Sequence, residues 1–269
     1  MKRSYICLAL LLTLGIGFAI SSALFPPLNA LVNWGLMAIG AAILAILAFF
    51  FKFETVALGS KEIALVSMLA ATSAVLRIPF AAIPSFQPCT FLIICSGYVF
   101  GPISGFMVGA MTPLISNFFL GQGPWTLYQM LAWGLIGYGA AYLRRFNLNR
   151  KGLIIIGVIC GFIFGFLTNI YFWLYFAYPL TLNTLIFAQL SSLWFDASHA
   201  IGNAIFLGLF GMKTIGILER FKKRFNWNLC VIAVNRSPEP FDSCHSEGEK
   251  RPKNLAQGKL REGEAKQSL

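Results

Sequence analysis

Charged side chains are scarce in this sequence: Asp, Glu, Lys and Arg make up 12% of its 269 residues. Soluble globular domains carry about 25% charged residues, and the mean hydropathy here is +0.72. The apolar runs are also far longer than the roughly 10 residues of a membrane β-strand. The composition therefore argues against a soluble domain and a β-barrel, and predicts an all-α polytopic membrane protein.

Several motifs are also missing. There is no G-x-x-x-x-G-K-[ST], which excludes ATP binding by a P-loop. The six cysteines contain no C-x-x-C pair, and most lie in apolar runs, so we expect buried thiols rather than disulfides or a zinc site. We find no metal triad and expect no metal and no cofactor. The net charge of +11 does not indicate nucleic acid, because the basic residues fall in short loops and a tail.

Eight apolar segments are predicted to span the membrane. They are Tyr5–Leu24, Ala30–Phe51, Ile63–Ile78, Thr90–Phe100, Ile103–Leu120, Trp125–Leu143, Leu153–Phe176 and one within Thr184–Met212. With both termini in the cytoplasm, 20 of the 21 Lys and Arg residues fall on the cytoplasmic side, and Arg77 is the exception. This asymmetry follows the positive-inside rule and predicts a multi-pass protein of a cell membrane.

The eight segments divide into three regions. Residues 1–61 form an N-terminal hairpin of two spans that carries no charge within the membrane. Residues 62–212 form a six-helix membrane domain. Residues 213–269 form a basic cytoplasmic tail, which is too polar beyond Phe225 to bury a core and is expected to be mostly disordered.

One carboxylate stands out within the apolar segments. Asp196 is the only acidic residue between Glu62 and Glu219, and it lies near the middle of the last predicted span. His199 and Asn203 follow at spacings of three and four, so the three side chains share one helix face. A carboxylate at membrane depth costs about 3 kcal/mol unless it is paired or hydrated. We interpret this face as ligand-binding; the alternative is that Asp196 only holds neighbouring helices together.

Other polar and aromatic side chains collect at the predicted outer ends of the spans. The amides need partners within the membrane, either one another or a ligand. Together with the aromatic side chains they predict an outward-open cavity with a few polar anchors. The candidate substrate-binding residues are Arg77, Gln87, Asn117, Trp125, Gln129, Asn169, Trp173, Asp196, His199 and Asn203.

From Glu62 to Met212 the sequence resembles the substrate-binding S components of energy-coupling factor (ECF) transporters. The resemblance is carried by the six-span unit, by Ala70-x-x-x-Ala74 on its first span, and by a proline-rich first outer loop. It also includes FQPCTFLIICSGYVFGPISGFMVGAMTP, the turn GQGPW, and the last span with its polar face. The hairpin and the tail depart from the basic family plan.

The resemblance implies a non-enzymatic subunit of a prokaryotic plasma membrane that captures a vitamin, with cobalamin as the leading candidate. It implies a membrane coupling subunit and two cytoplasmic ATPases as partners. By the same resemblance, Ala70 and Ala74 would face the coupling subunit. The outer loops Ile78–Thr90, Gly121–Pro124 and Ala177–Asn183 would gate the pocket.

Two other functions remain open at this stage. A self-contained secondary transporter would use Asp196 and His199 as a proton relay, although one carboxylate and no evident inverted repeat give it little support. An intramembrane serine protease similar to the rhomboids would use Ser96 and His199. Its G-x-S-G motif would need Gly at position 94, which is Ile94.

Overall fold

The computed structural model describes residues 3, 4, 6, 7, 9–11, 13, 34–55, 60–177 and 179–224. Within these residues all regular structure is helical, as predicted. The predicted first span, Tyr5–Leu24, lies mostly outside the described residues, and so does the tail beyond Arg224. One contact of the N-terminal segment is visible, because the Ser4 hydroxyl donates to the carbonyl oxygen of Ala48 at 3.0 Å.

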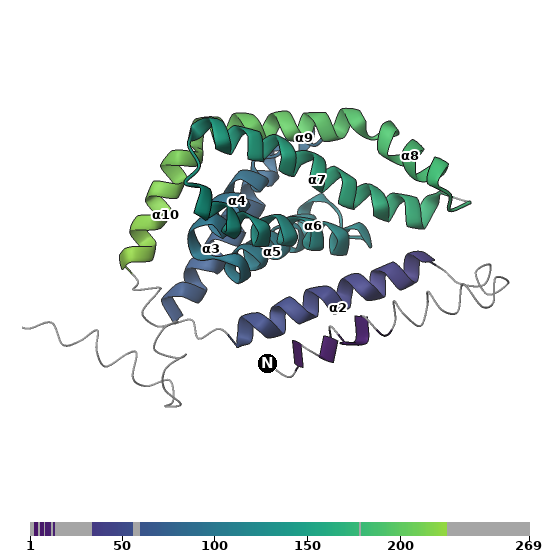
Figure 1. Ribbon diagram of the computed structural model, residues 1–269, viewed down its shortest axis with the longest axis horizontal. Coiled ribbons are helices and arrows are strands. Elements are labelled where there is room, and N and C mark those ends of the chain that lie inside the picture. Colours follow the sequence, from purple (N-terminus) through teal and green to yellow (C-terminus); the bar gives the residue numbers. More distant parts are fainter. Residues whose placement is uncertain are drawn as a thin grey trace, which may run out of the picture. The chain divides into compact units, whose positions relative to one another are not determined.

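Most described helices follow the predicted segments (Figure 1). The helices are α2 (Trp34–Glu54), α3 (Ser60–Arg77), η2 (Pro79–Ala82), α4 (Cys89–Phe100), α5 (Pro102–Leu120), α6 (Trp125–Ala140), η3 (Ala141–Phe146), α7 (Arg150–Phe176), α8 (Leu182–Ser191), α9 (Leu193–Phe206), η4 (Leu207–Gly211) and α10 (Met212–Arg224). The first part of the predicted tail differs, because Met212–Arg224 is a helix whose Ile215 and Leu218 are buried in the core. Five stretches, two of which join consecutive helices, are long and apolar enough to cross a bilayer. They are Trp34–Glu54, Ser60–Ala82 (α3 with η2), Pro102–Leu120, Arg150–Phe176 and Leu193–Arg224 (α9 with η4 and α10). The total of eight spans therefore stays a prediction.

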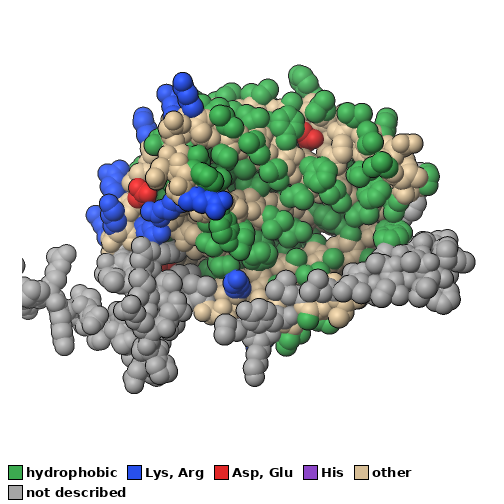
Figure 2. Space-filling model, viewed as in Figure 1, with side chains coloured by type: hydrophobic (Ala, Val, Ile, Leu, Met, Phe, Trp, Pro, Cys, Tyr) green, Lys and Arg blue, Asp and Glu red, His purple; other side chains and the backbone are tan. Residues whose placement is uncertain are grey.

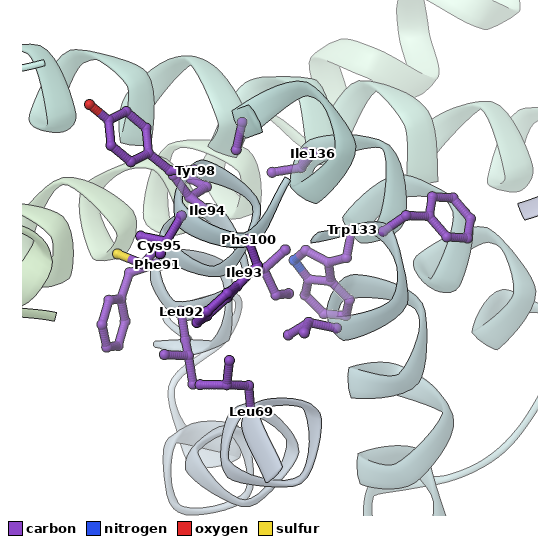
Figure 3. Packing of buried hydrophobic residues seen from close by; sticks show 14 of the residues in the cluster. Leu69, Phe91, Leu92, Ile93, Ile94, Cys95, Tyr98, Phe100, Trp133 and Ile136 are labelled. Atoms are coloured by element: carbon purple, nitrogen blue, oxygen red, sulfur yellow. The ribbon is translucent and has the colours of Figure 1, made fainter. Parts of the chain in front are cut away.

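Helix α4 lies at the centre of the bundle, and each of its twelve residues is buried. A helix that is apolar on every face is suited to such a position, because it has no side that favours water. Its side chains pack against Leu69 of α3 and against Trp133 and Ile136 of α6 (Figure 3). At 1.5 Å per residue, α4 is only about 18 Å long, so it is enclosed by longer helices rather than spanning by itself.

Glycines allow α4, α5 and α6 to approach closely. A Cβ atom on Gly105 of α5 would lie 2.6 Å from the Cα of Gly97 in α4 and 2.7 Å from the carbonyl carbon of Gly137 in α6. Small residues at such crossings are what bring membrane helices into backbone contact. This contact fixes the positions of α5 and α6, whose outer ends carry several of the predicted site residues.

A second glycine series joins α7 to α9. Gly157, Gly161 and Gly165 follow one another at intervals of four residues on one face of α7. A Cβ atom on Gly161 would lie 2.7 Å from the backbone nitrogen of Ala200 in α9, so the two helices meet without a side chain between them. The polar face of α9 is thereby held against α7.

The last predicted span differs from a single helix. It consists of α8 and α9, which are separated at Ser192, and α9 continues through η4 into α10. The sequence gives no proline or glycine signal at Ser192, so the break could not be expected from local composition. It places the hydroxyl of Ser192 beside Asp196, as described below.

The surface is consistent with a bilayer environment. Large apolar side chains such as Phe118, Phe187 and Trp194 are more than 70% exposed. Figure 2 shows hydrophobic side chains over much of the described face, with most Lys and Arg side chains gathered near the end where α10 lies. An apolar surface of this extent is suited to lipid and not to water.

Candidate functional site

Arg77, at the end of α3, is the most unusual buried residue of the bundle. Its side chain is 6% exposed, and its guanidinium donates to three uncharged side chains. Nε donates to Gln87 Oε1 at 2.7 Å, while Nη1 donates to Ser116 Oγ at 2.7 Å and to Asn117 Oδ1 at 2.6 Å. The Trp133 ring lies against the guanidinium, with 4.9 Å from Cζ to the ring centroid. A buried arginine thus joins α3, α5, α6 and the loop before α4.

Asn117 extends these contacts to α6. Its Nδ2 donates to Gln129 Oε1 at 2.8 Å and to Thr126 Oγ1 at 2.9 Å. Thr126 in turn donates to Gln122 Oε1 at 2.9 Å, at the turn between α5 and α6. We call Arg77, Gln87, Ser116, Asn117 and Gln129 the arginine cluster. Four of its five members were predicted as site residues, and the structure brings those four together.

A second set of contacts centres on Thr90 at the start of α4. The Thr90 hydroxyl accepts from Trp133 Nε1 at 2.9 Å and lies 3.0 Å from His199 Nε2. All three side chains are at least 97% buried. Because Trp133 also covers the guanidinium of Arg77, His199 of α9 is connected to the arginine cluster through two neighbouring side chains.

The loop between α3 and α4 is attached to α9 by two further contacts. His199 Nδ1 lies 2.8 Å from the carbonyl oxygen of Ser85, and Ser198 Oγ donates to the carbonyl oxygen of Pro84 at 2.8 Å. Ser85 itself has a φ of 58°, a backbone conformation that non-glycine residues adopt only infrequently. The loop that carries Gln87 is therefore held over the bundle by named contacts.

The Thr90 hydroxyl is expected to matter for stability. Thr90→Val keeps the shape but removes the acceptor of Trp133 Nε1, which leaves a buried N–H without a partner. We expect the free energy of unfolding to fall by about 1–3 kcal/mol, seen as a lower apparent melting temperature in detergent. Thr72→Val is the control, because Thr72 is exposed and its hydroxyl donates to the carbonyl oxygen of Met68, one turn back on the same helix. Equal melting temperatures for both variants would contradict this role.

Comparison with known families identifies the scaffold that carries these contacts. The model of the family described as ECF transporter, substrate-specific component, matches residues 61–221, which is more than half of the chain. The chain belongs to this family. No curated protein and no solved structure matches it. The ECF substrate-specific components are membrane-embedded transport subunits, so the chain is a substrate-binding membrane subunit of an ECF transporter.

In this ECF component, Asp196 lies in a separate polar group from the arginine cluster. Asn169 Nδ2 of α7 donates to Asp196 Oδ2 at 3.1 Å, and Ser192 Oγ donates to the same oxygen at 2.9 Å. Asn169 also contacts Ser192 Oγ and lies 3.1 Å from Gln189 Oε1 of α8. Asp196 is partly exposed, and the helices α7 to α9 carry no other acidic residue.

A glycine makes room for this carboxylate. A Cβ atom on Gly165 of α7 would overlap the carboxyl group of Asp196. Gly165 therefore leaves space for a polar side chain between α7 and α9. Gly157 and Gly161 instead leave space for backbone atoms of α9. Asp196 is hydrogen-bonded to Asn169 and Ser192 and is still partly exposed. These contacts are compatible with both predicted roles, binding a ligand and holding neighbouring helices together.

The remaining predicted site residues lie apart from both groups. Trp125 is 43% exposed and donates to the carbonyl oxygen of Gly121 at 3.3 Å. Trp173 donates to Thr184 Oγ1 at 3.0 Å, which joins α7 to α8. Asn203 is fully buried and donates to the carbonyl oxygen of Gly157 at 3.3 Å. The structure therefore separates Asp196, His199 and Asn203, which share a helix face, into three different sets of contacts.

The two alanines predicted to face the coupling subunit are buried within the chain itself. Ala70 and Ala74 are 2% and 1% exposed. The exposed face of α3 instead carries Ser67 and Ala71, which have the same spacing of four, with Val75 61% exposed beyond them. A partner that docks on α3 as it stands would contact this second pair. The role of Ala70 and Ala74 stays a prediction that requires α3 to separate from its neighbours.

The protease and relay hypotheses find no supporting contacts among the described residues. Ser96 is buried, and its hydroxyl donates to the carbonyl oxygen of Leu92 at 2.7 Å, one turn back on its own helix. His199 contacts Thr90 and Ser85, and no hydrogen bond in this part of the chain joins it to Ser96 or to Asp196. No three His, Cys, Asp or Glu side chains of the described segments come together as a metal site.

Sequence reasoning missed four members of the contacts around Arg77 and Thr90, as well as Gln189 beside Asn169. Ser116, Thr90, Trp133 and Thr126 are common residue types in apolar helices, and none stands out alone. One signal was available for Trp133, which lies four residues after Gln129 and eight after Trp125, on the same face of α6. Thr90 and Ser116 have no such signal, because the contacts that place them in these groups join them to His199, Trp133 and Arg77, which are at least 39 residues away in the chain.

Proposed function

We propose that this subunit captures a vitamin or related micronutrient from outside a prokaryotic cell, with cobalamin as the leading candidate. A membrane coupling subunit and two cytoplasmic ATPases then drive its release inside. The observation that supports substrate capture best is the arginine cluster, which gathers polar groups of α3, α5 and α6 within an apolar bundle. Polar side chains in a membrane bundle carry a desolvation cost, and they are found mainly where they serve function.

The predicted topology supports an approach from outside. Both termini and almost all basic residues are predicted to be cytoplasmic, which puts the arginine cluster and the α3–α4 loop at the outer end. Opening that loop would break its contacts with Ser198 and His199. We propose that the loop closes over bound substrate, with Gly121–Pro124 and Ala177–Asn183 at the rim.

The proposed partners account for the energy source. The sequence contains no P-loop, so ATP hydrolysis has to be supplied by other subunits. We propose that the coupling subunit docks on the exposed face of α3, along Ser67 and Ala71. The predicted pair, Ala70 and Ala74, would join this interface when α3 separates from its neighbouring helices. Small residues on an exposed membrane helix allow such close approach.

The first test is direct binding by the purified chain. Vitamins are added singly to the full-length protein in detergent, and the apparent melting temperature is followed. A ligand present at about 100 times its dissociation constant stabilises the folded state by about 2.7 kcal/mol. We expect one vitamin to bind with sub-micromolar affinity and one-to-one stoichiometry in the absence of partner subunits. If no vitamin binds and no coupling subunit co-purifies, the proposal fails.

The role of Asp196 is tested in the same assay. We expect Asp196→Ala to weaken binding about tenfold or more if Asp196 contacts substrate, since it removes the carboxylate of α9 that the sequence predicts as a substrate-binding group. Asp196→Asn is the informative companion, because it keeps an oxygen for Asn169 and Ser192 and removes only the charge. Normal binding by both variants would show that Asp196 does not contact the substrate. Normal binding by Asp196→Asn together with weak binding by Asp196→Ala would indicate a purely structural role.

A further inference from the structure

Arg77 determines the direction of the hydrogen bonds around it. A guanidinium only donates, so Asn117 has to present Oδ1 to it, at 2.6 Å. The amide nitrogen of Asn117 then donates to Gln129 Oε1 at 2.8 Å. Gln87 accepts from Arg77 in the same way, through Oε1 at 2.7 Å. The side-chain oxygens of both glutamines are therefore used within the protein.

The side-chain polar atoms of the arginine cluster that have no partner among the described residues are all donors. Three of the five guanidinium N–H groups are used, and the two on Nη2 have no acceptor in the part of the chain that the structure describes. The Nε2 amide groups of Gln87 and Gln129 likewise have no acceptor among those residues. Both glutamines are partly exposed, so a ligand can reach them.

The charge of Arg77 is also unbalanced. The ion pair found among the described residues joins Arg144 to Glu219, and no carboxylate of this region lies within 4.0 Å of Arg77. The unplaced segments before Ser60 contain no acidic residue, and the other acids lie in the tail beyond Arg224. A buried charge without a counter-charge is strongly unfavourable, and Trp133 shields only one face of it.

Unused donors beside an unpaired cation suit a ligand that only accepts hydrogen bonds. We infer that the substrate carries a compact oxyanion, a carboxylate or a phosphate, which binds Arg77 Nη2 and the free amides of Gln87 and Gln129. This inference rests on the proposed function and narrows its substrate class. A planar guanidinium edge matches such an anion in geometry as well as charge, which lysine does not.

The first arm of the test uses the anions alone. The full chain in phospholipid-free, non-ionic detergent is melted with inorganic phosphate or acetate, against chloride at equal ionic strength. We expect phosphate or acetate to raise the apparent melting temperature of the wild type by about 2 °C or more, and to have no such effect on Arg77→Gln. Arg144→Gln, an exposed arginine, is the matched control and should respond like the wild type. Gln129→Ala provides a milder variant if Arg77→Gln does not fold.

The second arm uses pairs of vitamins that differ in an oxyanion. The pairs are nicotinate and nicotinamide, pantothenate and pantothenol, pyridoxal phosphate and pyridoxal, and cobalamin and cobinamide, which lacks the phosphodiester. We expect the bound vitamin to be the member that carries the oxyanion, with its partner about 100-fold weaker, and Arg77→Gln to abolish the difference. Arg77→Lys should recover only part of it.

The outcomes separate this inference from the proposed function. Tight binding of a neutral vitamin that Arg77→Gln leaves unchanged overturns the anion site and keeps the transport subunit. An anion effect without vitamin binding keeps the anion site and contradicts vitamin capture. No response in either arm overturns the anion site, and it overturns the proposed function as well if no vitamin of the wider screen binds and no coupling subunit co-purifies. Stabilisation by phosphatidylglycerol in mixed micelles, but by no vitamin, would assign the site to a lipid phosphate and overturn the inference.

Discussion

Ala71→Trp is expected to abolish vitamin uptake while leaving vitamin binding intact. Ala71 lies on the exposed face of α3, one turn beyond Ser67, where we propose that the coupling subunit docks. A bulky ring at a close helix contact costs about 1–3 kcal/mol, which corresponds to a loss of about five- to 150-fold in affinity for the partner. The measurement pairs uptake by cells that contain the complete transporter with binding by the purified variant.

Two further substitutions make this result interpretable. Ile155→Trp places the same ring on the exposed side of α7, where Ile155 is 59% exposed, and should not affect uptake. Ala74→Trp places it in the interior, where Ala74 is 1% exposed, and should destabilise the bundle before it affects docking. If Ala74→Trp instead binds vitamin normally and blocks uptake, the docking face includes the buried pair. Unchanged uptake in Ala71→Trp would show that the coupling subunit does not dock on the exposed face of α3.

The second large effect is expected at Gly105, where the added methyl group has no space. Its Cβ would lie 2.6 Å from the Cα of Gly97 and 2.7 Å from the carbonyl carbon of Gly137, so backbone atoms of two helices block it. Neither helix can yield as a flexible side chain would. We expect Gly105→Ala to lower the free energy of unfolding by about 3 kcal/mol and the apparent melting temperature by about 5 °C or more.

Gly139→Ala is the control for this substitution. Gly139 is on α6, and a Cβ atom there would meet nothing within 4 Å. Alanine has the better helix propensity, by about 0.5–1 kcal/mol, so this variant should be as stable as the wild type or more stable. A melting temperature for Gly105→Ala that matches Gly139→Ala would contradict the close backbone contact among α4, α5 and α6.

The helices could be located from the sequence because their signals are local. The apolar run before Gly101-Pro102 ended where α4 ends, and the turn Gly121–Pro124 separated α5 from α6 as expected. The break at Ser192 was missed, because hydropathy continues through it and the chain offers no proline or glycine there. Local composition predicts which segments enter the membrane, but it does not predict where one apolar segment divides into two helices.

The sequence predicted many of the residues of the candidate site, but only partly which of them contact one another. Arg77, Gln87, Asn117 and Gln129 were selected separately, as polar side chains near the outer end, and their mutual contacts follow from packing over up to 40 residues. Asp196, His199 and Asn203 were grouped by helical spacing. The structure separates them because each meets a different neighbour: Asn169, Thr90 and Gly157. Helical periodicity places side chains on one face, but it does not identify what that face meets.

The most direct test of the central claim is uptake of the bound vitamin in cells with defined sets of subunits. The chain is expressed alone, with the coupling subunit and active ATPases, and with ATPases inactivated in their own P-loops. Our account predicts vitamin binding in all three cases, because capture needs only this subunit, and uptake only with the active ATPases. Uptake by the chain alone, driven by a pH gradient, would contradict it and indicate a secondary transporter.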